Sequence, residues 1–197
     1  MSARSRHGVL AMLSVLALAA PATAYADGGS AARARAASQR CADADAMPGQ
    51  APGDDLREAT LCLMNAERAA RGLGRLQAEP LLGRVAARYA RQMVRGRFFD
   101  HTSPGGSTML ARIRATSYLR DVSSWSVGEN LAWGSGRLAT PRATVRAWMQ
   151  SADHRANLLD RHFADVGIVV AAGAPIALYP GELGGTYVTD FGRRLRG

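Results

Sequence analysis

The sequence predicts an α+β domain in which helices precede and surround a small sheet. Apolar residues recur at helical spacing over two long segments, 54–70 and 79–95. Two runs near the C-terminus, 166–172 and 186–191, are rich in β-branched and aromatic residues and are bounded by glycine and proline. Helices and strands arranged in this order typically pack as layers around one core.

The ends of the two long helices are marked in the sequence. Asp54 stands where an N-cap residue belongs, and Gly72 follows the last apolar position of the first helix. Pro80 suits the first turn of the second helix, and Gly96 ends it. Shorter helices are expected over 109–114, 141–150 and 155–159.

Residues 1–26 have the features of a secretory signal peptide. Basic residues up to His7 precede an apolar run over 8–20, which is shorter than the roughly 20 residues that span a bilayer. The small residues Ala24 and Ala26 then form a signal-peptidase pattern. We therefore expect a secreted, extracellular protein with no retained membrane span; a retained anchor is the alternative.

The exported chain divides into two parts. Residues 27–53 show no helical or strand periodicity, and we interpret them as a flexible N-terminal arm. The apolar pattern is sustained over 54–197, a length that suits one domain with its own core.

Cys41 and Cys62 are the only two cysteines. Export to an oxidising compartment favours a disulfide between them, which would join the arm to the first helix and close a loop of about 20 residues. Two free, buried thiols are the alternative. The spacing matches no metal-binding pattern.

The net charge of +9 is the difference between 25 basic residues, all of them arginine, and 16 acidic residues. They are scattered among acidic residues, and no series of aromatic residues accompanies them to stack on bases. We therefore expect no nucleic-acid partner. Attraction to an anionic cell-wall polymer or to lipid headgroups is the more plausible use of this charge.

Three segments carry groups that bind zinc or move protons at neutral pH. His101 lies in FFDHTSPGG, Glu129 in GENLAWG and His154 in WMQSADHRANLL. Two imidazoles and one carboxylate would suffice for an open zinc site, with water in the remaining position. The alternatives are an exposed loop histidine at His101 and a carboxylate that holds a loop at Glu129. His162 is interpreted as a surface residue.

The order of six motifs resembles a known family. From about Leu61 to Gly192, the chain is similar to the bacterial, secreted branch of the CAP superfamily (cysteine-rich secretory protein, antigen 5, pathogenesis-related 1), also called the SCP domain. The matching segments are LMNAERAARGLGRL at 63–76, FFDHTSPGG at 98–106, VGENLAWG at 127–134, WMQSADHRANLL at 148–159, VGIVVA at 166–171 and TYVTDFG at 186–192.

The resemblance implies a three-layer α-β-α sandwich. It also implies a cavity lined by two histidines and two acidic residues. His101, Glu129 and His154 fall on three of these positions, and the fourth falls near Ser151, which is not acidic. Asp153 is a candidate substitute, and Ser151, Asp153 and Asn130 are candidates to support the cavity.

We expect a secreted, non-enzymatic, monomeric CAP-domain protein at or outside the cell envelope, with or without attachment to the wall. Its His101/Glu129/His154 cavity would bind a divalent cation such as zinc, or a small ligand, lipid or envelope component. One alternative is a zinc-dependent hydrolase of esters or peptides with Glu129 as the general base. An extracellular lipid or sterol carrier is the other.

Overall fold

The structure, a computed structural model, describes residues 28–195. The expected signal peptide, residues 1–26, lies outside the described residues. Between residues 28 and 195, no helix is both long enough and apolar enough to cross a membrane.

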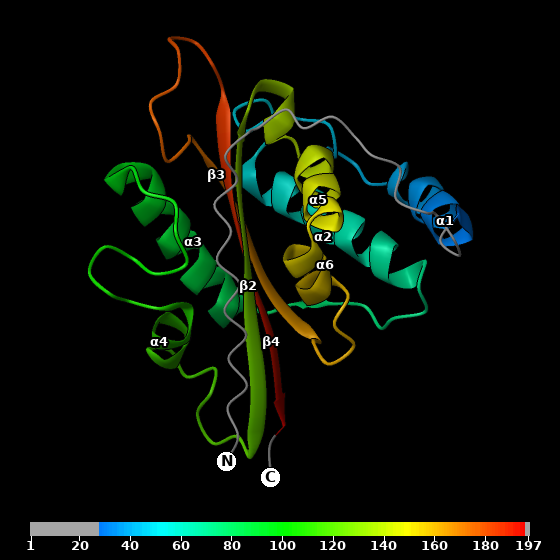
Figure 1. Cartoon of the computed structure of the whole chain (residues 1–197), viewed down its shortest axis with the longest axis vertical. Helices are drawn as coiled ribbons and strands as arrows, with labels where there is room; N and C mark the ends of the chain where they lie inside the picture. Colours follow the sequence, from blue (N-terminus) through cyan, green and yellow to red (C-terminus); the bar gives the residue numbers. More distant parts are fainter. Residues whose placement is uncertain (1–27, 196–197) are drawn as a thin grey trace.

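A four-stranded sheet forms the middle layer of the molecule (Figure 1). The order across the sheet is β1-β3-β4-β2. β3 and β2 both pair antiparallel with β4, whereas the short β1 pairs parallel with the start of β3. The strands are β1 (Gln77–Ala78), β2 (Ser124–Ser135), β3 (Asp165–Ala172) and β4 (Gly184–Leu195).

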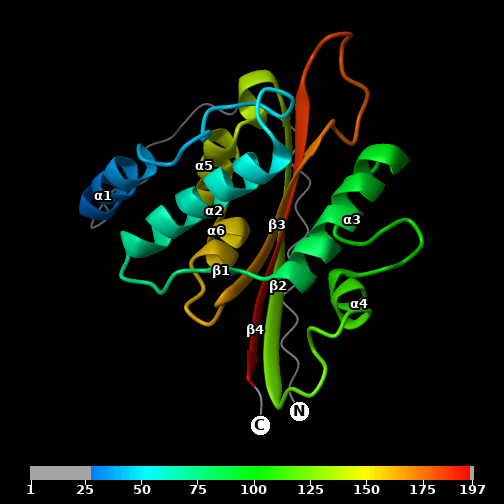
Figure 2. The same cartoon turned by 180° about the vertical axis from the view of Figure 1, so that it is seen from behind.

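Helices cover both faces of the sheet, which confirms the predicted three-layer α-β-α sandwich (Figures 1 and 2). One face carries α3 (Pro80–Gly96) and α4 (Met109–Arg114). The opposite face carries α2 (Gly53–Ala69), α5 (Pro141–Gln150) and α6 (Ala152–Leu158), with α1 (Gly28–Ser38) packed against α2. A short 3-10 helix, η1 (Gly136–Ala139), connects β2 to α5.

The central strand β4 contributes to the core on both faces of the sheet. Tyr187 and Phe191 pack with residues of α2, α5 and α6. Val188 points to the other face and packs with Tyr89 and Met93 of α3. Successive side chains of a strand point to opposite faces of the sheet, so neighbouring residues of β4 pack in different layers.

β2 is a long strand that the sequence analysis did not predict. It is a twelve-residue strand that contains the whole GENLAWG segment and pairs with β4 from Ser124↔Leu195 to Ser135↔Gly184. Glycine, asparagine and glutamate are poor strand formers, so the local pattern of this segment is weak. Pairing with the full length of β4 compensates for that weak propensity.

The predicted disulfide between Cys41 and Cys62 is confirmed, and it joins the segment before α2 to α2 itself. That segment contains α1, which the sequence did not indicate because its small residues show no apolar periodicity. Arg142 at the start of α5 adds further contacts to the same segment. Its backbone N–H donates to Ala44 and its guanidinium pairs with Asp45, 2.8 Å away.

Arg68 is a buried cation at the end of α2. Its guanidinium donates to the backbone carbonyls of Gly74, Leu158, Asp160 and Phe163 at 2.7–3.1 Å. Burial lowers the pKa of this side chain. Because carbonyl oxygens take up its donors, Arg68 fixes α2 to the segment that leads from α6 into β3.

We expect Gly167→Ala to lower the free energy of unfolding by about 1–3 kcal/mol, because a Cβ there would overlap backbone atoms of Leu82 and Gly83 in α3. Gly83→Ala is the matched control. Its Cβ would meet no atom within 4 Å, so the better helix former should stabilise the protein by about 1 kcal/mol. Urea denaturation followed by circular dichroism measures both. A Gly167→Ala variant as stable as the parent would contradict the close approach of α3 to β3.

Candidate functional site

The candidate site lies at the outer edge of β2, where both helical layers reach around the sheet. His101 is in the loop between α3 and α4, Glu129 is on β2, and His154 is on α6. His101 contacts Glu129 directly. His154 is held beside the same strand, because Nδ2 of Asn130, the residue after Glu129, donates to its backbone carbonyl at 3.0 Å. The fold therefore brings together three groups from distant parts of the sequence.

Glu129 is a buried carboxylate with only 2% of its side chain exposed. Its Oε1 lies 2.8 Å from Nδ1 of His101, and its Oε2 accepts a hydrogen bond of 2.6 Å from Nη2 of Arg112. A carboxylate can only accept, so Nδ1 of the His101 ring carries a proton, and in the neutral form of the ring the lone pair is on Nε2. Glu129 thus sets both the orientation and the tautomer of His101.

Arg112, from α4, connects Glu129 to the loop that carries His101. Its Nη1 donates to the backbone carbonyls of His101 and Ser107 at 3.0 and 2.9 Å. The guanidinium also lies over the ring of Tyr89, 3.3 Å from the ring centre. An arginine held by two carbonyls, a carboxylate and an aromatic face is rigid, and it holds the loop in one position.

A second carboxyl group, Asp190, lies directly opposite Glu129 on β4 and is fully buried. In the described part of the chain, no donor group reaches either of its oxygens. Burial, followed by the charge of Glu129, raises the pKa of Asp190 well above its usual range, and the charge of Arg112 opposes this shift. A protonated Asp190 can donate a hydrogen bond to Glu129, and this hydrogen bond also favours the protonated form of Asp190.

His154 is held by Ser151, whose Oγ lies 2.8 Å from Nδ1 of the ring. Burial, followed by the charge of His101, lowers the pKa of His154, and the charge of Asp153 opposes this shift. The neutral ring is therefore favoured near neutral pH. With Nδ1 directed at Ser151, the ring nitrogen left for a ligand is Nε2.

Two asparagines attach α6 to β2. Asn130 is fully buried and its Nδ2 donates to the backbone carbonyl of His154 at 3.0 Å. Asn157 donates to Oδ1 of Asn130 and to the carbonyl of Glu129. β2 is the outermost strand of the sheet, so its outward carbonyls need donors from elsewhere. Asn157 supplies one and at the same time places His154 beside the strand.

The remaining residues singled out from the sequence, Asp153 and His162, do not hold the rings of the site. Asp153 is exposed, and no hydrogen bond within residues 28–195 links it to the ring of His154; Ser151 makes that contact. His162, interpreted from the sequence as a surface residue, is 70% exposed and pairs with Asp160.

The donor set fits two imidazoles better than the three ligands expected from the sequence. Among the described residues, no three His, Cys, Asp or Glu side chains are placed to hold one metal ion. Both oxygens of Glu129 are engaged by His101 and Arg112. Within residues 28–195, no hydrogen-bond partner reaches the Nε2 atoms of the two rings, so these are the nitrogen atoms left for a ligand.

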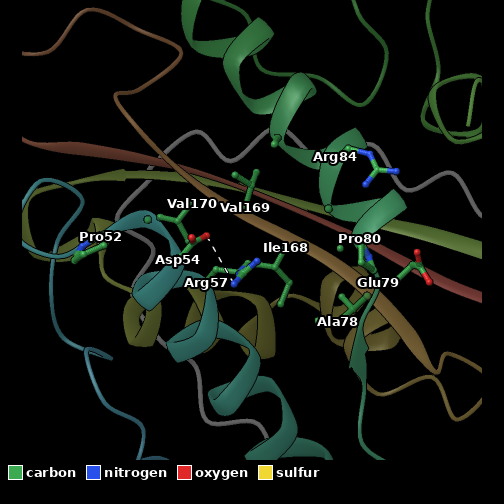
Figure 3. A pocket seen from close by; sticks show the side chains of 15 residues that line it. Pro52, Asp54, Arg57, Ala78, Glu79, Pro80, Arg84, Ile168, Val169 and Val170 are labelled. Carbon is green, nitrogen blue, oxygen red and sulfur yellow. Dashed lines mark ion pairs between the residues drawn. The ribbon is translucent and has the colours of Figure 1, made fainter.

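Two clefts lie elsewhere on the molecule, and neither is lined by His101, Glu129 or His154. One has a volume of about 580 Å³ and lies between α2 and α3 along the edge of β3. Figure 3 shows the Asp54–Arg57 ion pair on its α2 side and Arg84 on α3. The other has a volume of about 630 Å³ and lies beside the outer face of α3.

Sequence reasoning missed Arg112 and Asp190. Nothing near Arg112 distinguishes it from the other arginines, because its partner lies 17 residues away on a strand that was not predicted. Asp190 did leave a signal, since it is a charged residue inside the apolar run of a predicted strand.

Comparison with known proteins identifies related chains. The cysteine-rich secretory protein family, CAP, matches residues 61–176, more than half of the chain. The protein YkwD of Bacillus subtilis (strain 168) is 34% identical over 106 residues, which are 54% of this chain but 38% of YkwD. This chain therefore corresponds to well under half of that relative.

Two solved structures share the fold. An extracellular protein with an SCP domain from Bacillus anthracis aligns with a TM-score of 0.53 and 22% identity, over 76% of this chain and 45% of that one. An outer surface protein from Borrelia burgdorferi aligns with a TM-score of 0.51 and 24% identity, over 66% of this chain and 86% of that one.

We expect Arg112→Met to lower the free energy of unfolding by about 3–5 kcal/mol, because the carboxylate of Glu129 would remain buried without its cation. Adding Glu129→Gln removes the unpaired charge and should recover part of this loss. Urea denaturation of the parent, the two single variants and the double variant measures the coupling. Additive effects of the two substitutions would contradict a direct ion pair.

Asp190→Asn tests the protonation of the buried pair. Because the folded pKa of Asp190 is raised, the parent should lose stability as the pH rises from its ordinary value of 3.8 through the folded pKa. Asparagine does not titrate, so the difference in unfolding free energy, variant minus parent, should grow as the pH rises above about 4. Asp55→Asn makes the same change from a carboxyl to an amide group at an exposed position on α2, and it serves as the control. A difference that is constant with pH would show that Asp190 titrates alike in the folded and unfolded protein.

Proposed function

Because the chain belongs to the cysteine-rich secretory protein (CAP) family, we propose that it is a secreted binding protein that holds a divalent cation, zinc, between His101 and His154. The extracellular location is supported by the expected signal peptide. Two solved structures of the same fold come from proteins described as extracellular and as an outer surface protein.

One observation carries the proposal. Glu129 accepts the Nδ1 proton of His101 at 2.8 Å while its other oxygen is held by Arg112. A carboxylate that orients an imidazole in this way is a common support of metal-binding histidines, since it fixes the tautomer and makes the ring a better ligand. The side chain of His101 is 26% exposed, so part of it is accessible from outside.

The chemistry of the donor set favours binding over catalysis. Two imidazoles suit zinc, which prefers nitrogen ligands and four-coordinate geometry. With only two ligands from the protein, a bound ion would offer its remaining positions to water or to a donor group of another molecule. Such a site holds zinc weakly and is suited to binding a small ligand or envelope component through the ion.

The two alternative functions have less support. A hydrolase needs a general base within reach of water and substrate. Glu129 is buried and both of its oxygens are engaged, so it is poorly placed for that role. For a lipid or sterol carrier we would expect a mostly apolar pocket. Charged side chains interrupt the apolar lining of the two clefts described above, with Arg84 in both.

We expect zinc to bind the metal-stripped protein with a stoichiometry of one, and His101→Ala and His154→Ala each to abolish measurable binding. Glu129→Gln should weaken binding about 10- to 100-fold, because it removes the support of the ring without removing a ligand. Isothermal titration calorimetry near neutral pH measures all four proteins.

His162→Ala is the matched control, because it removes an exposed histidine that pairs with Asp160 away from the site. It should bind zinc as the parent does. An equal loss in His162→Ala, or a parent that binds no zinc, would refute the proposal. Hydrolysis of an ester or peptide that is lost in Glu129→Gln, with zinc still bound, would favour the hydrolase.

A further inference from the structure

The outer face of α3 carries a row of four arginines. Arg84, Arg88, Arg91 and Arg95 are spaced by four, three and four residues, and all four are exposed. At 3.6 residues per turn, this spacing places them within an arc of about 60° and along about 16 Å of the helix axis. We call these four residues the α3 arginine row.

No acidic group in the described part of the chain pairs with the row. None of its four side chains makes an ion pair or hydrogen bond within residues 28–195. Other arginines on the surface do, such as Arg142 with Asp45 and Arg194 with Glu79. An uncompensated row of cations creates a local positive potential that attracts anions to this face.

A groove runs beside the row. It has a volume of about 630 Å³ and lies between Arg84, Arg88 and Arg91 on α3 and the segment with Thr116 and Ser117. Arginine is suited to phosphate because its planar guanidinium donates two parallel hydrogen bonds, and the hydroxyl group of Ser117 is a further donor, whereas that of Thr116 already donates to the Ile113 carbonyl. The groove therefore combines positive charge with hydrogen-bond donors on both sides.

The shape and lining of the groove limit its occupant. Leu81 and Ala87 are its apolar lining residues, and no aromatic ring lines it. Without rings to stack on bases, the groove has little to offer a nucleic acid beyond its charge. A concave groove beside a row of regularly spaced cations is better matched to a single flexible chain than to the flat surface of a bilayer.

We propose that the α3 arginine row and its groove bind a linear polymer of phosphate groups that carries no bases. Successive guanidinium groups, about 5–6 Å apart along the helix, contact successive phosphates of one chain. This interaction is independent of the proposed cation site, because none of its residues contacts His101, Glu129 or His154 within the described structure.

The test compares two triple variants with the same net charge. One is Arg84→Gln/Arg88→Gln/Arg91→Gln. The control is Arg33→Gln/Arg35→Gln/Arg40→Gln, at three exposed arginines in and just after α1. The probe is a short inorganic polyphosphate with a fluorescent end label, and anisotropy measures its affinity at several salt concentrations.

We expect the α3 variant to bind at least about tenfold more weakly at low salt, and the slope of log K against log salt to fall by about 2. The control should change affinity less than about threefold. His101→Ala should bind the polymer as the parent does, which separates this result from the outcome of the zinc experiment. Circular dichroism checks that all variants are folded.

Three outcomes would overturn the proposal. Equal losses in the two triple variants would mean that overall net charge, and not the row, attracts the polymer. Tenfold tighter binding of a single-stranded oligonucleotide would point to a nucleic acid. A parent that binds vesicles of anionic phospholipid but not polyphosphate would assign this face to a membrane surface.

Discussion

The burial of one negative charge, at Glu129, is the constraint on which the site depends. A carboxylate in the middle of a strand, with 2% of its side chain exposed, must be compensated by a cation and by hydrogen bonds. Arg112 and His101 supply both. The carboxyl group opposite, Asp190, then favours its protonated form, because burial and, after it, the negative charge of Glu129 raise its pKa.

This compensation also organises the loop and the helix around the site. Arg112 reaches Glu129 only because α4 is in place, and the same guanidinium holds two carbonyls of the loop that carries His101. On the other side of β2, Asn130 and Asn157 attach α6 to the strand and position His154. The two imidazoles are therefore placed by a network whose centre is a supporting carboxylate. That arrangement is the basis of the binding function proposed above.

Arginine has two distinct roles in this protein. Arg68 and Arg112 are buried and act as centres of hydrogen bonding that connect segments far apart in the sequence. The α3 arginine row is exposed and has no partner among residues 28–195. Composition alone cannot separate these roles, because the net charge of +9 counts both kinds equally. The location of each side chain decides whether its charge is used inside the fold or is available to a ligand.

The sequence by itself determined the features that depend on neighbouring residues. The long helices α2 and α3, the strands β3 and β4, and the candidates His101, Glu129 and His154 all follow from local pattern and residue type, and the Cys41–Cys62 disulfide follows from the cysteine count and expected export. Only the tertiary structure decided that GENLAWG is a strand, that Arg112 neutralises Glu129, and that Ser151 and not Asp153 holds His154. Strand pairing and ion pairing depend on groups brought together by folding, such as Glu129 and Asp190, and their energies leave little trace in the local sequence.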